Sequence, residues 1–296
     1  MNPQVSIVIP TYNRAVDLKR AIDSVFNQTF SEWEILVVDN NSTDSTDELI
    51  SGYASQRITL LKIENHGVIA ASRNLGIKHA RGKWVAFLDS DDWWCPDKLT
   101  QSVQYLEGGA DLVFHDLFLV RSLGQRNYRR SGVSRGLELP VFNDLLMSGN
   151  AIENSSVVVR RSLLNEIGGL FEDKELIAME DYDAWLRIAK LTDNFVRLDQ
   201  VLGYYWLGGG NVSNPTLKLR NLTLFEERYS EEIVSLCGGG MPWWFDYGKG
   251  RAQFLLGKLP DAKLSLSKVS LLASPLTIKL KTVYMLVRIR FSKLSR

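Results

Sequence analysis

The first third of the chain alternates between short apolar runs and amphipathic stretches, and this alternation limits the available folds more than any other feature. The apolar runs are residues 5–9, 34–38, 58–63 and 84–88, each of strand length. The stretches between them place apolar residues at helical spacing. Apolar strands that alternate with helices are typical of a parallel sheet covered on both faces. The sequence therefore predicts an α/β fold, in which ligands bind at the carboxyl ends of the strands.

The rest of the chain is mixed and then helical. In the middle, residues 112–120 and 157–159 are expected strands and residues 182–190 an expected helix, while the polar stretch 122–135 is expected to form a loop or a hairpin. Further along, residues 247–272 predict a helical hairpin. No apolar stretch reaches the roughly 20 residues that a membrane-spanning helix needs.

Several functional classes are disfavoured by features that the sequence lacks. It has neither the G-x-G-x-x-G nor the G-x-x-x-x-G-K-[ST] motif, which argues against dinucleotide oxidoreductases and P-loop ATPases. Its three histidines form no H-E-x-x-H zinc motif, and its two cysteines form no disulfide framework. The formal net charge of +1 argues against a general nucleic-acid-binding surface.

A run of acids, Asp89-Ser90-Asp91-Asp92, follows the fourth apolar run directly. If the strand continues through the run, Asp89 and Asp91 point to the same side and can face one ligand. Three carboxylates within four residues repel one another unless a cation or a hydrogen-bond donor relieves them. Mg²⁺ or Mn²⁺, sharing its oxygen ligands with substrate phosphates, suits such a run. The structural alternative is an acidic loop ahead of a helix that starts near Pro96.

Four segments resemble the successive motifs of glycosyltransferase family two, in the same order and at similar spacing. They are VSIVIPTYNR (5–14), EILVVDNNSTDST (34–46), ASRNLGIKHARGKWVAFLDSDD (71–92) and MEDYDAWLRIA (179–189). The resemblance implies a GT-A fold, with a parallel-rich nucleotide-binding sheet flanked by helices. We expect a nucleotide-sugar-binding α/β half at residues 1–110, a mixed acceptor-binding half of the same domain at 111–215, and a basic helical C-terminal extension at 216–296.

The resemblance also implies a nucleotide site. The matching positions are Pro10, Thr11, Tyr12, Arg14, Asp39, Arg73, Asp89 and Ser90. The Tyr12 ring would lie against a pyrimidine face and Asp39 would accept a hydrogen bond from a uracil N–H, while Asp91 would coordinate Mn²⁺ or Mg²⁺. Each nucleotide residue has a structural alternative: Tyr12 as an aromatic residue at the rim, Asp39 as a turn residue and Arg73 as the partner of a surface acid.

The second acidic group is Glu180-Asp181. In the family this position supplies the general base that takes the proton from the acceptor hydroxyl. Asp181 matches that role, with Glu180 as runner-up. The reaction would be one in-line displacement at the anomeric carbon with inversion, in which the metal stabilises the charge on the departing nucleoside diphosphate. The alternative is a helix N-terminus, where acidic side chains are favoured in any case.

Residues beside these motifs are expected to touch the acceptor or the donor sugar. They are Asp92, Trp93, Trp94, Asn154 and Ser155. The two tryptophans can equally serve packing. The sequence departs from the family pattern at Gly208, which stands where members often carry a histidine. A histidine that would help to bind the metal or the diphosphate is therefore missing.

Charge is distributed unevenly along the chain. Residues 241–296 hold eleven Lys and Arg and two Asp, a net charge of +9, whereas residues 1–240 hold 24 basic and 32 acidic residues, a net charge of −8. Residues 276–296 interleave apolar residues with six Lys or Arg and contain no acid. Such a segment suits the surface of an anionic membrane. The alternatives are packing onto the acidic remainder of the chain and dimerisation.

The residues and the resemblance together predict an inverting, metal-dependent glycosyltransferase of the hexosyltransferase type. A sugar would pass from a nucleotide-diphospho-sugar, UDP-linked by the resemblance, to a hydroxyl of a glycan or lipid-linked saccharide in polysaccharide biosynthesis. We expect a cytoplasmic protein that the tail places at the cytoplasmic face of the membrane. The donor sugar, the linkage and the oligomeric state stay open. The rivals are a nucleotide-sugar-binding scaffold protein of the same fold and a nucleotidyltransferase, which normally has a glycine- and lysine-rich phosphate loop.

Overall fold

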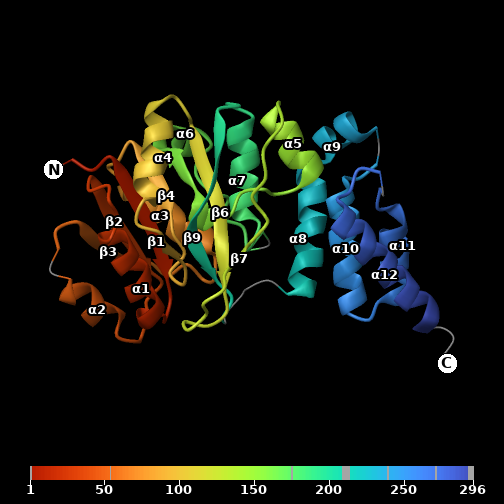
Figure 1. Cartoon of the computed structure of the whole chain (residues 1–296), viewed down its shortest axis with the longest axis horizontal. Helices are drawn as coiled ribbons and strands as arrows, with labels where there is room; N and C mark the ends of the chain where they lie inside the picture. Colours follow the sequence, from red (N-terminus) through yellow and green to blue (C-terminus); the bar gives the residue numbers. More distant parts are fainter. Residues whose placement is uncertain are drawn as a thin grey trace. The chain divides into compact units, whose positions relative to one another are not determined.

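The computed structural model describes residues 2–53, 55–174, 176–208, 214–238, 240–270 and 272–292. They form two compact units, each with its own core (Figure 1). Unit 1 comprises Met1–Val141 and Ala151–Asn211, and unit 2 comprises Phe142–Asn150 and Val212–Arg296. A short segment from the middle of the chain therefore belongs with the C-terminal part. The expected functional division at residues 110 and 215 stays a prediction.

Unit 1 is built on one sheet, whose described strands follow the order β3-β2-β1-β4-β8-β6-β9-β5, with β7 paired to β6. The first half of this sheet is parallel. Its strands are β1 (Val5–Thr11), β2 (Trp33–Asp39), β3 (Ile58–Lys62) and β4 (Trp84–Phe87). The helices between them are α1 (Ala15–Phe26), α2 (Thr46–Gly52) and α3 (Ile69–His79). The predicted α/β alternation is confirmed.

The second half of the sheet is mixed. Its strands are β5 (Trp93–Trp94), β6 (Leu112–Val120), β7 (Arg129–Arg130), β8 (Val158–Arg160) and β9 (Phe195–Trp206). β8 runs antiparallel to both β4 and β6, whereas β6 and β9 are parallel and their register shifts near Asp116. Helical segments α4 (Lys98–Glu107), η1 (Asn154–Ser156), α6 (Arg161–Glu166) and α7 (Glu180–Ala189) complete the described part of the unit. β7 pairs with β6, so the polar stretch 122–135 contributes to a hairpin.

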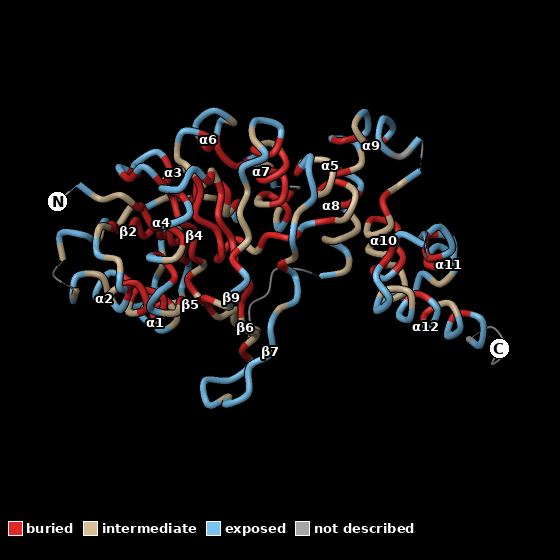
Figure 2. The backbone as a smooth tube through the Cα atoms, turned by 45° about the horizontal axis from the view of Figure 1, so that its top comes forward, coloured by how far each residue is buried: buried red, intermediate tan, exposed pale blue. Residues whose placement is uncertain are grey.

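The buried core explains the apolar runs of the parallel half. Every residue of β1 and β2 is buried. Figure 2 shows the buried backbone of the sheet in red around the label of β4. Ile7 of β1 stands in register with Ile35 on one side and Ala86 on the other. Helix α3 packs closely on this sheet, because a Cβ added at Gly76 would lie 2.5 Å from Val8 Cγ1. Continuous burial of the strands therefore accounts for their lack of polar alternation.

The register of the parallel strands fixes what stands at their carboxyl ends. Thr11 pairs with Asp39 across β1 and β2, and Asp39 pairs with Lys62 across β2 and β3. β4 ends at Phe87, opposite Val8 of β1, so the segment after β4 leaves from the same edge. The polar segments that follow these strands therefore share one edge of the sheet, where open α/β folds bind ligands.

Unit 2 is helical in its described residues. Its helices are α5 (Val141–Ser148), α8 (Pro215–Arg228), α9 (Ser230–Cys237), α10 (Trp243–Leu255), α11 (Leu259–Lys268) and α12 (Leu276–Ser292). α10 and α11 form the predicted hairpin, and a Cβ at Gly250 would lie 2.7 Å from Leu266 Cγ, so the two helices pack closely. α12 completes a small core of Ala262, Leu266, Met285 and Ile289. None of the helices in the described ranges combines the length and apolar character needed to cross a bilayer.

Gly76→Ala should lower the free energy of unfolding by about 1–3 kcal/mol, because the added Cβ overpacks a buried strand. Urea unfolding measures the change. Gly52→Ala is the matched control, since a Cβ there would meet nothing within 4 Å. The control should be neutral or stabilise by up to about 1 kcal/mol. Equal stabilities of Gly76→Ala and wild type would contradict the close packing of α3 on β1.

Candidate active site

Three polar segments meet at the carboxyl edge of the parallel strands. Asn13 N donates to Ser42 Oγ at 2.8 Å, and Thr43 N donates to Asn13 Oδ1 at 2.7 Å. Asn13 has a φ of 50°, in the left-handed region that Asn tolerates better than most residues. Arg14 Nη1 then pairs with Asp91 Oδ2 at 2.6 Å. Direct polar contacts therefore join the segments after β1, β2 and β4, as the motifs predict.

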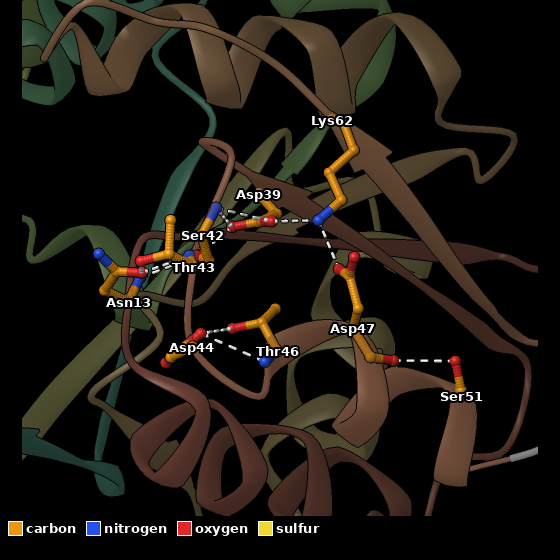
Figure 3. A network of polar contacts seen from close by, with 9 residues as sticks. All are labelled: Asn13, Asp39, Ser42, Thr43, Asp44, Thr46, Asp47, Ser51 and Lys62. Carbon is orange, nitrogen blue, oxygen red and sulfur yellow. Dashed lines mark hydrogen bonds and ion pairs between the residues drawn. The ribbon is translucent and has the colours of Figure 1, made fainter.

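The buried Asp39 carboxylate stands at the centre of a polar network (Figure 3). Ser42 N donates to both of its oxygens at 3.2 and 3.1 Å, Ser42 Oγ donates to Oδ1, and Lys62 Nζ donates to Oδ2 at 2.7 Å. Lys62 Nζ also donates to Asp47, and the hydrogen bonds to Asp39 and Asp47 raise the pKa of Lys62. The Lys62 side chain is 39% exposed. Lys62 therefore presents this network to solvent, whereas Asp39 does not.

The acids after β4 form a turn. β4 ends at Phe87, and Asp92 N donates to Asp89 O at 3.0 Å. Ser90 is buried within this turn. The expected strand alternation at Asp89 and Asp91 is therefore absent, because the extended backbone stops before the run. The turn instead sends the three carboxylates to different partners.

Asp92 is anchored in the core of unit 1, and Asp91 is not. The Asp92 carboxylate accepts hydrogen bonds from Ser155 Oγ at 2.6 Å and from Trp206 N at 2.9 Å, and the residue is 1% exposed. The Asp91 side chain is 22% exposed. The backbone carbonyl of Asp91 accepts a hydrogen bond from Arg20 Nη2 at 2.8 Å. Asp92 therefore holds the turn in place, while the Asp91 carboxylate remains accessible to a ligand.

Arg73 links the acidic turn to helix α7. Its guanidinium, 3% exposed, donates to Asp89 Oδ1 at 2.8 Å and to Glu180 Oε1 at 2.5 Å. Burial alone would lower the pKa of Arg73, but the charges of Asp89 and Glu180 raise it above its usual value. Asn154 Nδ2 adds a hydrogen bond to Asp89 Oδ1 at 3.2 Å. Arg73 is thus the buried partner of two site acids and not of a surface acid.

Asp181 follows Glu180 in the first turn of α7. Its carboxylate accepts a hydrogen bond from Tyr182 N at 2.7 Å, and the residue retains partial exposure. Burial and the charge of Glu180 raise the pKa of Asp181 to about 7, although Arg73 acts in the opposite direction. An accessible carboxylate with a pKa near neutral pH has the properties of a general base. One carboxylate oxygen of Glu180, in contrast, already accepts a hydrogen bond from Arg73.

Negative charge is concentrated around the acidic turn. Burial and the charge of Asp89 raise the pKa of Asp91, although Arg14 opposes the change, and burial raises the pKa of Asp92 well above its usual range. Burial and the charges of Asp92 and Asp89 also raise the pKa of Tyr205 on β9. A bound cation would relieve this repulsion. Among the residues that the structure describes, no three His, Cys, Asp or Glu side chains are arranged to hold a metal by themselves.

Buried polar atoms without partners occur at the same site. Within the described ranges, Thr11 Oγ1, Asn154 Oδ1 and Glu180 Oε2 accept or donate no hydrogen bond. Such atoms are rare in folded proteins. Pro10, directly before Thr11, is buried in β1, while Tyr12 is 56% exposed and offers an aromatic face. This combination favours a site that is completed by a ligand or by ordered water.

The family assignment follows from a direct comparison of the sequence. Residues 6–168, more than half of the chain, match the sequence model of the family "Glycosyl transferase family 2". The chain belongs to glycosyl transferase family 2. It is therefore a glycosyltransferase, and the resemblance drawn from the four motifs is confirmed.

A relative and two solved structures agree with this assignment. The chain is 33% identical over 187 residues to the UDP-Glc:alpha-D-GlcNAc-diphosphoundecaprenol beta-1,3-glucosyltransferase WfgD of Escherichia coli, covering 63% of this chain and 70% of the relative. Its fold resembles residues 1–349 of S. aureus TarS in complex with UDP-GlcNAc, with a TM-score of 0.63 and 19% identity, covering 90% and 82% of the two chains. It also resembles the mannosyltransferase PcManGT from Pyrobaculum calidifontis in complex with GDP-Man and Mn²⁺, with a TM-score of 0.58 and 19% identity, covering 96% and 79%. The predicted GT-A fold is confirmed.

Trp93 and Trp94 of the glycosyltransferase differ in their surroundings. Trp93 stacks on Tyr204 with ring centroids 5.0 Å apart, and the Arg20 guanidinium lies 4.5 Å from the Trp93 ring centre. Trp94 is only 3% exposed, and its Nε1 donates to Ser155 O at 2.7 Å. Because its faces are covered, Trp94 cannot stack on a sugar in this conformation, and the expectation of a sugar contact is corrected to packing. Ser155, 2% exposed, likewise supports the turn.

Gly208, where the resemblance leads us to expect a histidine, packs closely against Trp206. A Cβ there would lie 2.0 Å from Trp206 Cζ2, so any side chain would displace the indole. Trp206 N in turn holds the Asp92 carboxylate. The rest of that motif, residues 209–213, lies outside the described residues.

Sequence reasoning missed several polar residues of the site. They are Arg20, Ser42, Lys62, Glu153 and Tyr205. A signal existed for Lys62, because it ends the strand next to the one that Asp39 ends. No local pattern marks Glu153, which precedes the short helix η1 and accepts a hydrogen bond from Ser131 Oγ at 2.6 Å. Burial raises the pKa of Glu153 to about 7, so it is a second acid that titrates near neutral pH.

Arg73→Met should destabilise the glycosyltransferase by about 3–5 kcal/mol, because Glu180 would be buried without its cation. Urea unfolding measures the loss, and adding Glu180→Gln should recover part of it by removing the buried charge. Lys19→Met is the matched control, since it breaks an ion pair with Asp23 whose side chains are 59% and 43% exposed. The control should change stability by less than about 1 kcal/mol. Equal effects of Arg73→Met and Lys19→Met would contradict the role given to the buried pair.

Proposed function

We propose that the protein is an inverting, metal-assisted glycosyltransferase that transfers a sugar from a UDP-sugar to a hydroxyl of a saccharide or lipid-linked saccharide. The observation that carries the proposal is the pair of acidic groups on either side of Arg73. Asp91 is partly exposed in the turn after β4, and Asp181, with a pKa of about 7, lies in the first turn of α7. The first suits a cation-bound diphosphate, and the second suits an acceptor hydroxyl.

The proposed reaction is a single displacement. The acceptor oxygen attacks the anomeric carbon while its proton passes to an oxygen of Asp181. The bond between the anomeric carbon and the diphosphate oxygen breaks, and the nucleoside diphosphate departs with the electron pair. Attack opposite the leaving group inverts the anomeric configuration. Arg73 holds Glu180 beside Asp181, and the charge of Glu180 contributes to the raised pKa of Asp181.

The nucleotide half of the proposal rests on residues at the carboxyl ends of β1, β2 and β3. Tyr12 offers an exposed ring to the base. Asp39 is fully buried and already accepts hydrogen bonds from Ser42 and Lys62. We therefore assign Asp39 the role of positioning these two residues. The partly exposed ammonium of Lys62 is then the group that meets a carbonyl of the base.

The residues fit a divalent cation held by a single protein carboxylate. Mg²⁺ and Mn²⁺ take oxygen ligands and commonly share their shell with substrate phosphates and water. The Asp91 side chain is 22% exposed and pairs with Arg14, whereas Asp89 accepts hydrogen bonds from the buried Arg73 and from Asn154, and Asp92 is buried against Ser155. When bound, the cation would supply charge stabilisation for the departing diphosphate. Asp91 would hold it, with Arg14 alongside.

The donor and acceptor classes are proposed from a relative. The Escherichia coli protein is named for UDP-Glc as donor and for GlcNAc-diphosphoundecaprenol as acceptor. A UDP-hexose and a lipid-linked saccharide are therefore the first substrates to test with this chain. Gly208 motivates the rival, a nucleotide-sugar-binding protein without turnover. Acceptor-dependent release of UDP in the presence of Mn²⁺ distinguishes the two.

Asp91→Ala should abolish the Mn²⁺-dependent part of UDP binding while the fold stays intact, because a partly exposed carboxylate in a turn contributes little to the core. Isothermal titration calorimetry with UDP, with and without Mn²⁺, measures this. Asp97→Ala, which changes an exposed acid a few residues further on, is the matched control and should bind like wild type. Wild-type affinity of Asp91→Ala for UDP with Mn²⁺ would remove Asp91 from the cation site.

Asp181→Asn should reduce turnover by about 10²-fold or more while donor binding is unchanged. In the wild type only the deprotonated carboxylate accepts the proton, so the rate should rise with pH up to a pKa of about 7 and then level off. This rise of the rate with pH should be absent from the residual activity of Asp181→Asn. A variant with near-normal turnover and an unchanged pH profile would move the base elsewhere, with Glu180 next to be tested.

A further inference from the structure

Helix α12 has two apolar faces, one of which is covered. Thr282, Met285 and Ile289 recur at helical spacing and are buried. Met285 and Ile289 share a small core with Ala262 and Leu266 of α11. This face anchors α12 within unit 2, so substitutions on the opposite side of the helix leave its attachment in place.

The other apolar face of α12 is open to solvent. It consists of residues that are each 45–69% exposed, namely Leu276, Leu280, Val283, Tyr284, Val287 and Phe291. At about 100° per residue, the five other than Tyr284 fall within an arc of about 80°, with Tyr284 at its border and Met285 on the far side. Single exposed apolar residues are common, but a contiguous stripe indicates an interaction surface.

Basic side chains border this stripe on both sides. By the same helical count, Lys279 and Arg290 lie along one border, and Lys281 and Arg288 lie along the other. No Asp or Glu occurs in α12. Lys293 and Arg296, which belong to the predicted membrane-binding segment 276–296, lie outside the described residues.

We propose that the outer face of α12 binds the surface of a membrane that contains anionic lipids. The apolar stripe enters the boundary between headgroups and acyl chains, and the four bordering cations meet lipid phosphates. Lying flat, the 17-residue helix offers about 25 Å of contact length. The proposal is independent of the sugar donor and acceptor proposed above.

Charge favours a lipid surface over a second copy of this chain. Two copies that met through this face would bring their Lys and Arg side chains together, and α12 has no acid to pair with them. The surrounding sequence does not supply acids either, since residues 241–296 contain only Asp246 and Asp261 against eleven Lys and Arg. An anionic membrane supplies both an apolar layer and the opposite charge.

Vesicle co-sedimentation of the full-length protein tests the proposal. At low salt the protein should co-sediment with phosphatidylcholine vesicles that contain phosphatidylglycerol, and far less with vesicles of phosphatidylcholine alone. The bound fraction should fall as salt is added, because the lipid charge is screened. Full-length protein that stays in solution with the anionic vesicles at low salt would overturn the proposal, whatever the variants show.

Two double variants separate the apolar and the charged contributions. Leu280→Gln with Val287→Gln should lower partition into anionic vesicles by about tenfold or more, because two apolar side chains no longer leave water. Lys281→Glu with Arg288→Glu should also weaken binding and flatten its salt dependence. Leu123→Gln, at a position 69% exposed outside α12, is the matched control and should bind like wild type. Thermal unfolding verifies that the variants stay folded.

Two outcomes would contradict the lipid assignment. Unchanged partition of both double variants would show that α12 is not the binding surface. Light scattering tests the other occupant. A full-length dimer that becomes monomeric in the Leu280→Gln, Val287→Gln variant, without any binding of vesicles, would assign this face to a second copy of the chain and overturn the proposal.

Discussion

The buried guanidinium of Arg73 is the interaction on which the proposed site depends. It joins Asp89, 16 residues away in sequence, to Glu180, 107 residues away, and so ties the turn after β4 to the start of α7. Its own position follows from α3, which Gly76 allows to approach β1 closely. Removing one partner of a buried ion pair is strongly destabilising. The two acidic groups of the site therefore keep a fixed relation, although they come from distant parts of the chain.

The same arrangement leaves the site with an excess of negative charge. Burial raises the pKa values of Asp91, Asp92 and Asp181, which means that ionising these carboxyl groups costs free energy in the folded protein. Unfavourable carboxylates of this kind are common at functional sites, where a ligand or a proton relieves them. In the proposed reaction, a cation bound at Asp91 would relieve part of that cost when the donor binds. A proton accepted by Asp181 would relieve another part when the acceptor hydroxyl reacts.

The sequence predicts local and regular features well, and contacts between strands poorly. The expected strand at residues 112–120 matches β6 at its observed bounds, and the rule for parallel strands brings the segments after β1, β2 and β4 to one edge. The turn at residues 89–92 is missed because the apolar run leads directly into it. Lys62 and Glu153 are missed because their partners, Asp39 and Ser131, lie on other segments. The long strand β9 escapes prediction because its register shift breaks the alternation.

The stereochemistry of the product tests the central claim most directly. Asp181 acting as the single base opposite the leaving diphosphate requires one displacement at the anomeric carbon. The measurement is the proton NMR spectrum of the glycoside formed from an α-linked UDP-sugar and a saccharide acceptor, recorded in the first turnovers. The account predicts a β-linked product. An α-linked product would show retention and would contradict a mechanism built on one base at Asp181.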